Sequence, residues 1–157
     1  MNYLSFKTPV GFITLYEQHR KLIALKFIRT GIIYTSSDLL LECKRQVLEY
    51  FAKEREIFDC PLLINGTDFQ RKVWDLLLHI PFGQVRSYYD LAVALGNKNF
   101  VRAVANANRV NPLPILIPCH RVIGKNYYLK GYSSGVYIKK FLLEHEGHKI
   151  VNNRLII

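Results

Sequence analysis

Residues 67–109 read TDFQRKVWDLLLHIPFGQVRSYYDLAVALGNKNFVRAVANANR, and this stretch predicts three short helices. Thr67, followed three residues later by Gln70, is a capping-box pattern that marks a helix start. Pro81 ends that first helix, because proline lacks the backbone donor that a helix interior needs. One face of the helix is apolar and carries Phe69, Val73, Trp74, Leu77 and Ile80.

Two further helices follow in the same stretch. Ser87 is a second N-cap, for a helix over 88–95 that Gly96 ends. A third helix is expected over about 99–109, and it ends before Pro112. Three short helices with a tight turn between the second and the third are typical of a helix-turn-helix.

The chain after these helices completes the outline of a winged helix-turn-helix. Residues 115–117 predict a strand, and residues 127–131 predict a wing-like loop. A last helix is expected from Ser134 or Gly135 to residue 145. The apolar tail, 151–157, predicts no particular element.

The N-terminal part predicts a smaller and different arrangement. Apolar and polar residues alternate over 3–7, 11–17 and 21–28, with short polar links between them, which predicts a meander of antiparallel strands. Ser37 is an N-cap for an amphipathic helix that reaches Lys53. Its expected apolar face carries Leu40, Leu41, Val47, Leu48 and Phe51.

Pro61 and Gly66 break this pattern and indicate a linker over 59–66. We therefore divide the chain into 1–64, an N-terminal α/β lobe, and 65–157, a winged helix-turn-helix domain. The predicted fold class is α+β.

The charge is concentrated in the second of these parts. The chain carries 22 Lys and Arg against 12 Asp and Glu, a net charge of +10, which favours a polyanionic partner. No acidic residue lies between Asp90 and Glu144, a stretch that holds many cations. Such a tract suits phosphate neutralisation, although a merely solvated basic face has the same pattern.

Cys43, Cys60 and Cys119 form an odd set without paired spacing, so a disulfide-stapled secreted scaffold is not expected. Buried structural cysteine is the expected role of Cys43 and Cys60. The N-terminus lacks the features of a signal peptide, and no apolar stretch is long enough to span a bilayer. We expect an intracellular, cytoplasmic protein without membrane contact.

Pro118-Cys119-His120-Arg121 is where a cysteine, an imidazole and a cation meet. A cysteine acts as a nucleophile as the thiolate, and a neighbouring His or Arg lowers its pKa. Glu146 is a candidate to orient the imidazole. Its carboxylate interacts unfavourably with the helix dipole at a helix C-terminus, which hints that the residue is there for another purpose. The alternatives are an inert buried cysteine and a solvated helix end.

Taken together, the motifs resemble the O6-alkylguanine-DNA alkyltransferases over residues 66–148. In order along the chain they are Phe69-Gln-Arg-Lys-Val-Trp74, Ile80-Pro-Phe-Gly83, Ser87-Tyr-Tyr-Asp-Leu-Ala92, Arg102-Ala-Val104, Asn111-Pro112, Ile117-Pro-Cys-His-Arg-Val122, Gly131-Tyr-Ser133 and 142–147. The N-terminal lobe matches the family's variable ribonuclease-H-like lobe in outline. The expected fold is thus a ribonuclease-H-like sheet and helix followed by a winged helix-turn-helix.

The resemblance implies a catalytic role for each of five residues. Cys119 looks like the alkyl acceptor, and His120 looks like the base that takes its proton through a water. Glu146 looks like the carboxylate that orients the imidazole. Asn111 resembles the residue that braces the active-site turn. Tyr88 looks like the tyrosine that crowds a phosphate beside the target nucleotide and donates to the leaving guanine.

The resemblance also implies a DNA-binding helix and a base pocket. Arg102 looks like the finger that fills the stack after the target base rotates out, and its helix enters the minor groove. The expected DNA contacts are Arg102, Tyr88, Ala103, Arg109 and Arg121. The expected pocket residues are Tyr132, Ser133, Val122 and Cys119.

The function implied is repair of O6-alkylguanine, and of O4-alkylthymine, in double-stranded DNA. The base is flipped out and its alkyl group moves irreversibly to Cys119, once per molecule. A displacement at an alkyl carbon needs a thiolate and a proton donor, so no metal and no cofactor is expected. We expect a monomer.

Two other functions fit part of the pattern. A DNA-binding module without transfer chemistry would explain the charge but would leave Cys119 idle. A cysteine hydrolase would place its nucleophile and base far apart in sequence, unlike Cys119 and His120.

Three features depart from the family pattern. Ser134 stands where glycine is usual, and the loop over 125–130 is bulky and basic, which leaves the acceptance of large O6 substituents open. Asn106 and Asn108 are more polar than the small residues expected on the recognition helix. They either add hydrogen bonds or cap exposed backbone.

Overall fold

A computed structural model describes residues 1–31, 35, 37–130, 132 and 135–157. The chain forms two compact units, Met1–Asn65 and Gly66–Ile157. Each unit is described by itself.

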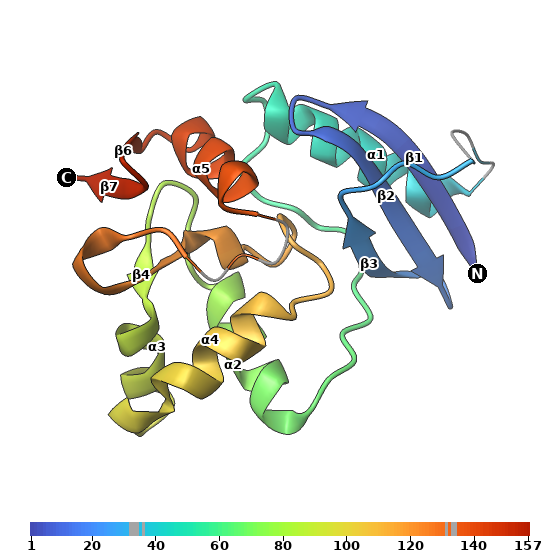
Figure 1. Cartoon of the computed structure of the whole chain (residues 1–157). Coiled ribbons are helices and arrows are strands. Elements are labelled where there is room, and N and C mark those ends of the chain that lie inside the picture. Colours follow the sequence, from blue (N-terminus) through green and yellow to red (C-terminus); the bar gives the residue numbers. More distant parts are fainter. Residues whose placement is uncertain (32–34, 36, 131, 133–134) are drawn as a thin grey trace. The chain divides into compact units, whose positions relative to one another are not determined.

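The first unit is a three-stranded meander with one helix packed on it (Figure 1). The strands are β1 (Asn2–Thr8), β2 (Gly11–Gln18) and β3 (Lys21–Lys26), each antiparallel to the next. Helix α1 (Asp38–Phe51) contacts β1 and β2. The predicted meander and helix are confirmed, except that β3 ends earlier than expected.

The buried face of α1 differs from the predicted face. Cys43, Gln46 and Tyr50 are buried, whereas Leu41 and Leu48 are exposed. Leu40, Cys43, Val47 and Tyr50 follow the spacing of three and four that keeps residues on one side of a helix. Leu41 and Leu48 are each one position further along, so the backbone turns them outward.

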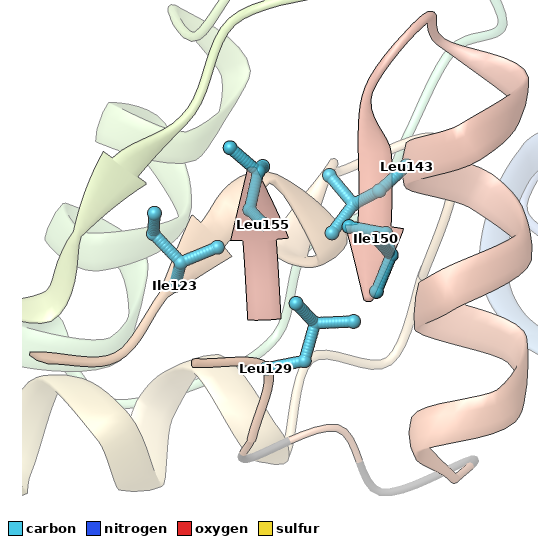
Figure 2. Packing of buried hydrophobic residues seen from close by; sticks show 5 residues of the cluster. All are labelled: Ile123, Leu129, Leu143, Ile150 and Leu155. Atoms are coloured by element: carbon cyan, nitrogen blue, oxygen red, sulfur yellow. The ribbon is translucent and has the colours of Figure 1, made fainter. Parts of the chain in front are cut away.

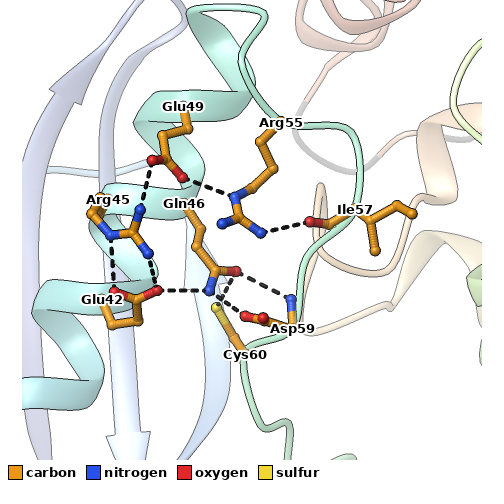
Figure 3. A network of polar contacts seen from close by, with 8 residues as sticks. All are labelled: Glu42, Arg45, Gln46, Glu49, Arg55, Ile57, Asp59 and Cys60. Carbon is orange, nitrogen blue, oxygen red and sulfur yellow. Dashed lines mark hydrogen bonds and ion pairs between the residues drawn. The ribbon is translucent and has the colours of Figure 1, made fainter.

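Gln46 connects α1 to the segment that leaves it (Figure 3). Its Oε1 accepts from the Asp59 backbone at 3.1 Å and from the Cys60 thiol at 3.2 Å. Cys43 lies inside α1, and a hydrogen bond with Cys60 raises its pKa. Cys43 is buried, as predicted, but Cys60 is only half-buried. A partly exposed chain of ion pairs beside Gln46 consists of Glu42, Arg45, Glu49 and Arg55.

The second unit is built on three helices, α2 (Asp68–Leu78), α3 (Tyr88–Ala94) and α4 (Val101–Arg109). Both α2 and α3 pack on α4. Thr67 and Ser87 cap α2 and α3 with complete capping boxes, so the three predicted helices are confirmed. Among the described residues, no helix is long and apolar enough to cross a membrane.

The strand predicted over 115–117 is wrong. The chain there forms turns, and Ile115 has a φ of +73°, outside the strand region. Pro112, Pro114 and Pro118 remove backbone donors, so this buried segment bonds within itself, as when Ile117 N donates to Leu113 O at 2.8 Å.

The tail after α5 (Val136–His145) is a hairpin, which the sequence did not predict. Strands β6 (Lys149–Val151) and β7 (Arg154–Ile156) pair antiparallel. Leu129 N donates to Asn153 O at 2.9 Å, and Arg154 Nε donates to Asn126 O at 3.0 Å. The hairpin therefore braces both the wing-like loop and the short 3-10 turn η3 (Lys125–Tyr127) that leads into it.

A small apolar cluster joins the wing, α5 and the hairpin (Figure 2). Its buried members are Ile123, Leu129, Leu143, Ile150 and Leu155. The hairpin supplies two of these side chains, so its burial stabilises the unit.

Replacing Leu155 by Ala is expected to destabilise the second unit by about 3 kcal/mol, through lost burial and a cavity. Trp74 is the only tryptophan and lies in this unit, so its fluorescence during urea unfolding reports the change. The control is Ile157→Ala, at a side chain that is 90% exposed. Equal effects of the two substitutions would show that the hairpin adds no core.

Candidate active site

Cys119 follows a rigid, buried approach loop. It opens the 3-10 turn η2 (Cys119–Arg121), which leads into β5 (Val122–Ile123), and β5 pairs with β4 (Arg86–Ser87). Asn111 Nδ2 donates to Ile117 O at 2.8 Å, and Asn111 Oδ1 accepts from Leu113 N at 3.0 Å. Asn111 therefore fixes the loop that presents Cys119.

His120 and Glu146 are adjacent although 26 residues separate them in the chain. His120 Nε2 lies 2.6 Å from Glu146 Oε2, and both residues are buried. Glu146 is the C-cap of α5, and η2 carries His120, so the pair ties these elements together. The sequence had left this contact open.

The electrostatics of the pair fix the tautomer of the imidazole. Burial favours a raised pKa for Glu146, but His120 and Arg121 outweigh it, and the pKa of Glu146 is strongly lowered. Burial lowers the pKa of His120 despite the nearby carboxylate. An ionised carboxylate only accepts, so Nε2 carries the proton and Nδ1 keeps its lone pair. Nδ1 is buried without a hydrogen-bond partner among the described residues.

Arg121 was expected to contact DNA, and the structure corrects this expectation. Its side chain is buried, with Nε donating to Glu146 Oε1 at 2.8 Å and Nη2 donating to Glu146 Oε2 at 3.0 Å. Nη1 donates to Ile80 O at 2.7 Å. Its donors are thus turned into the protein, because a buried carboxylate needs a paired cation.

The Cys119 thiol is buried, and burial raises its pKa to about 11. Hydrogen bonds from Asn111 and Tyr132 and the charge of Lys139 act in the opposite direction. The thiol is therefore protonated near neutral pH in the free protein, so a nearby base must take its proton before it can act as a nucleophile.

Lys139 is a site residue that the sequence analysis counted only as part of the basic tract. It is fully buried, and its ammonium donates to Val122 O and, at 2.8 Å, to Lys130 O. Burial lowers its pKa to about 8. The sequence contained a pattern from which this burial could have been predicted. Lys139 lies three residues from Val136 and from Leu142, on an apolar face of the helix.

Tyr88 joins this group from the start of α3. Its hydroxyl donates to Lys130 O at 2.7 Å, and the Lys139 ammonium lies 5.7 Å from the centre of its ring. Burial raises its pKa, and so does the nearby Cys119. The phenol therefore keeps its proton at neutral pH.

The other predicted residues occupy three kinds of place. Val122 and Tyr132 are buried beside this group. Ser133, with Ser134, lies outside the described residues. Arg102, Ala103 and Arg109 are exposed on α4. Arg102 and Arg109, seven positions apart, share one face of the helix.

A groove of about 810 Å³ lies between the start of α3 and the wing. Its lining includes three cations, Arg86, Lys125 and Lys130, and the exposed ring of Tyr89. Among the described residues, none of these cations has an ion-pair partner. One carboxylate, Asp90, also lines the groove and accepts from Ser87 N at 2.9 Å. The cations outnumber it, so the groove suits an anionic ligand.

Comparisons with known proteins account for nearly the whole chain. Residues 68–148 match the family model "6-O-methylguanine DNA methyltransferase, DNA binding domain", and residues 1–64 match "6-O-methylguanine DNA methyltransferase, ribonuclease-like domain". A relative in Bacillus subtilis, named constitutive methylated-DNA–protein-cysteine methyltransferase, is 43% identical over 92% of this chain and 94% of its own. A methylated-DNA–protein-cysteine methyltransferase of Methanosarcina acetivorans is 40% identical, over 94% and 99%. The Mycobacterium tuberculosis OGT, solved in complex with DNA, superimposes with a TM-score of 0.82 at 38% identity, over 92% of each chain.

Replacing Arg121 by Met is expected to destabilise the second unit by about 3 kcal/mol, because Glu146 is left as a buried charge without its cation. Urea unfolding followed by Trp74 fluorescence measures this. The matched control, Arg109→Met on the exposed face of α4, should change stability by less than about 0.5 kcal/mol. If the two variants are equally stable, the Arg121 guanidinium is not part of the folded core.

Proposed function

This chain belongs to the 6-O-methylguanine DNA methyltransferase family, and from that membership we propose that it repairs O6-alkylguanine in DNA by moving the alkyl group to its own Cys119. The observation that carries the assignment to Cys119 is the buried arrangement around it. The buried Cys119 thiol is next in the chain to His120, whose Nδ1 lone pair is unpaired among the described residues and whose Nε2 is held by the ionised Glu146 carboxylate.

The first step is proton removal from the thiol. Glu146 holds His120 with its Nδ1 lone pair available, and the lowered pKa of His120 keeps the ring neutral at physiological pH. We propose that a water bridges the Cys119 thiol and His120 Nδ1, as buried polar sites commonly use one. The proton passes to His120, and the resulting imidazolium is stabilised by Glu146.

The second step is displacement at the alkyl carbon. The Cys119 sulfur forms a bond to that carbon while the carbon–O6 bond breaks and the electron pair leaves with guanine. The Tyr88 hydroxyl, which keeps its proton at neutral pH, donates a hydrogen bond to the leaving base, and the proton that His120 took from the thiol balances the charge of the departing guanine. The thioether has no leaving route, so each molecule reacts once.

The damaged nucleotide must leave the duplex to reach a buried thiol. We propose that α4 enters the minor groove, where Arg102 fills the gap and Ala103 permits close approach to the DNA. Arg109, on the same helix face, contacts phosphate. The groove beside the wing binds the DNA backbone next to the damaged nucleotide.

The remaining expectations follow from this activity. A protein that reacts once with one base needs no second copy, so we propose a monomer. Its substrate is the cell's DNA, so we propose that it acts in the cytoplasm, or in the nucleus where there is one.

Cys119→Ala is expected to abolish alkyl transfer and to leave duplex binding within about twofold, since the thiol is buried and the proposed DNA contacts are exposed side chains of α4. Intact mass and peptide mapping after incubation with duplex carrying O6-methylguanine should show one methyl on Cys119 of the unmodified protein and none on the variant. Cys60→Ala is the control and should react normally. A methyl on another residue would refute the assignment.

Arg102→Ala is expected to slow repair of duplex DNA by at least tenfold while changing the reaction with free O6-benzylguanine by less than about twofold. The free base needs no gap filled in the stack. Single-turnover rates on both substrates measure the difference, with Arg71→Ala as a control on an exposed arginine of α2. Equal losses on the two substrates would exclude a role in flipping.

A further inference from the structure

Two of the three cysteines lie together in the first unit, and the proposed reaction uses neither of them. Cys43 is buried on the inner face of α1, and Cys60 is half-buried on the segment that leaves this helix. The two thiols share a hydrogen bond. A pair of thiols in contact can form a disulfide, which a single thiol in a monomer cannot.

Gln46 fixes Cys60 against the helix that carries Cys43. The Cys60 thiol donates to Gln46 Oε1 at 3.2 Å, and the Asp59 backbone donates to the same oxygen at 3.1 Å (Figure 3). Gln46 is 1% exposed and lies three residues after Cys43, so both share the buried face of α1. One amide therefore holds Cys60 at the turn of the helix that contains its partner.

The chain that follows Cys60 is fixed as well. Leu22 of β3 donates from its backbone to Pro61 O at 2.9 Å and accepts from Leu63 N at 2.8 Å. Cys60 is thus held by α1 through Gln46 and by β3 through the next residues. The contact between the two thiols is therefore part of the packing of the first unit.

The two thiols differ in exposure and in pKa. The hydrogen bond from Cys43 lowers the pKa of Cys60, and the charge of Arg55 acts in the same direction. The pKa of Cys43 is raised by the hydrogen bond with Cys60 and by burial. An accessible thiol of low pKa beside a second thiol is the arrangement that reacts with oxidants and then forms a disulfide.

We propose that Cys43 and Cys60 are a redox-active pair that hydrogen peroxide converts to a disulfide. The Cys60 sulfur attacks one peroxide oxygen, the O–O bond breaks, and the other oxygen leaves as water with the thiol proton. Cys60 is then a sulfenic acid. The Cys43 sulfur attacks the Cys60 sulfur, the S–O bond breaks, and the hydroxyl leaves as water with the Cys43 proton. The two thiols lose two electrons, and one peroxide becomes two waters.

Cys119 does not compete for the oxidant. Its thiol is 3% exposed, and burial raises its pKa to about 11, so it is protonated at neutral pH. Oxidation of the first unit therefore leaves the Cys119 thiol reduced. The disulfide also links α1 to the segment that leaves it, and such a link stabilises a fold by restricting the unfolded chain.

The test treats the full chain with a few molar equivalents of hydrogen peroxide and then blocks the remaining thiols in urea. Intact mass should show the loss of two hydrogen atoms, which dithiothreitol restores. Peptide mapping without reductant should join the peptides of Cys43 and Cys60 and recover Cys119 as a blocked thiol. Oxidation of Cys119 first, a dimer linked through Cys60, or a sulfinic acid at Cys60 in place of the bond would each overturn the inference.

Cys43→Ala and Cys60→Ala separate the two roles. In Cys43→Ala, Cys60 should still react but should stop at the sulfenic acid, which dimedone traps. In Cys60→Ala, trapping at Cys43 should be at least about tenfold slower, because that thiol is buried and has a raised pKa. Equal trapping in the two variants would show that Cys60 is not the attacking thiol.

Circular dichroism establishes that both variants are folded. Should Cys43→Ala not fold, Cys43→Ser replaces it, with the same expected trapping at Cys60. No alkylated DNA enters these experiments, so their outcome does not depend on the proposed function.

Thermal unfolding of the natural protein, followed by far-UV circular dichroism, measures the effect of the bond. The oxidised form should unfold about 5 °C higher than the reduced form. Cys60→Ala, treated with peroxide in the same way, is the control and should show no shift. A lower midpoint for the oxidised natural protein would mean that the bond distorts α1, and it would overturn the inference that the fold places the pair for this reaction.

Discussion

A buried carboxylate sets the main constraint on the second unit. Glu146 is ionised inside the protein, and a charge there requires partners that offset its lost hydration. His120 and Arg121 supply them, and Arg121 also bonds to Ile80 O. One carboxylate thereby connects the end of α5, the turn after Cys119 and the chain that leaves α2. Removing any of these partners would disturb the nucleophile as well as the fold.

The same burial gives a physical reason for the proton relay that we propose. A thiol in an apolar site has a raised pKa and is poorly reactive at neutral pH. Lys139, Asn111 and Tyr132 partly offset this for Cys119. In the proposed mechanism, neutral His120 then takes the thiol proton when the substrate is present. A protected thiol of this kind suits a protein that can react only once.

Local signals explain which elements the sequence could predict. The capping boxes at Thr67 and Ser87 and the alternation in the first strands depend on residues within a few positions of one another, and these elements form as expected. The apolar run over 115–117 led to the wrong strand prediction, because the prolines on either side remove backbone donors and the buried segment bonds within itself through turns. On the predicted face of α1, Leu40 and Val47 are buried, but Leu41 and Leu48, one position or about 100° further round the helix, are exposed.

The sequence by itself determined the helices of the second unit, the meander of the first and the cluster at Cys119 and His120, since each depends on neighbours along the chain. Only the tertiary structure decided that Glu146 reaches His120, that Arg121 faces inward, that Lys139 and Asn108 belong to the site and that the tail braces the wing. These are contacts between distant segments. The identity of a residue does not tell whether its cation or amide faces solvent or a buried carbonyl, so tertiary packing decides its role.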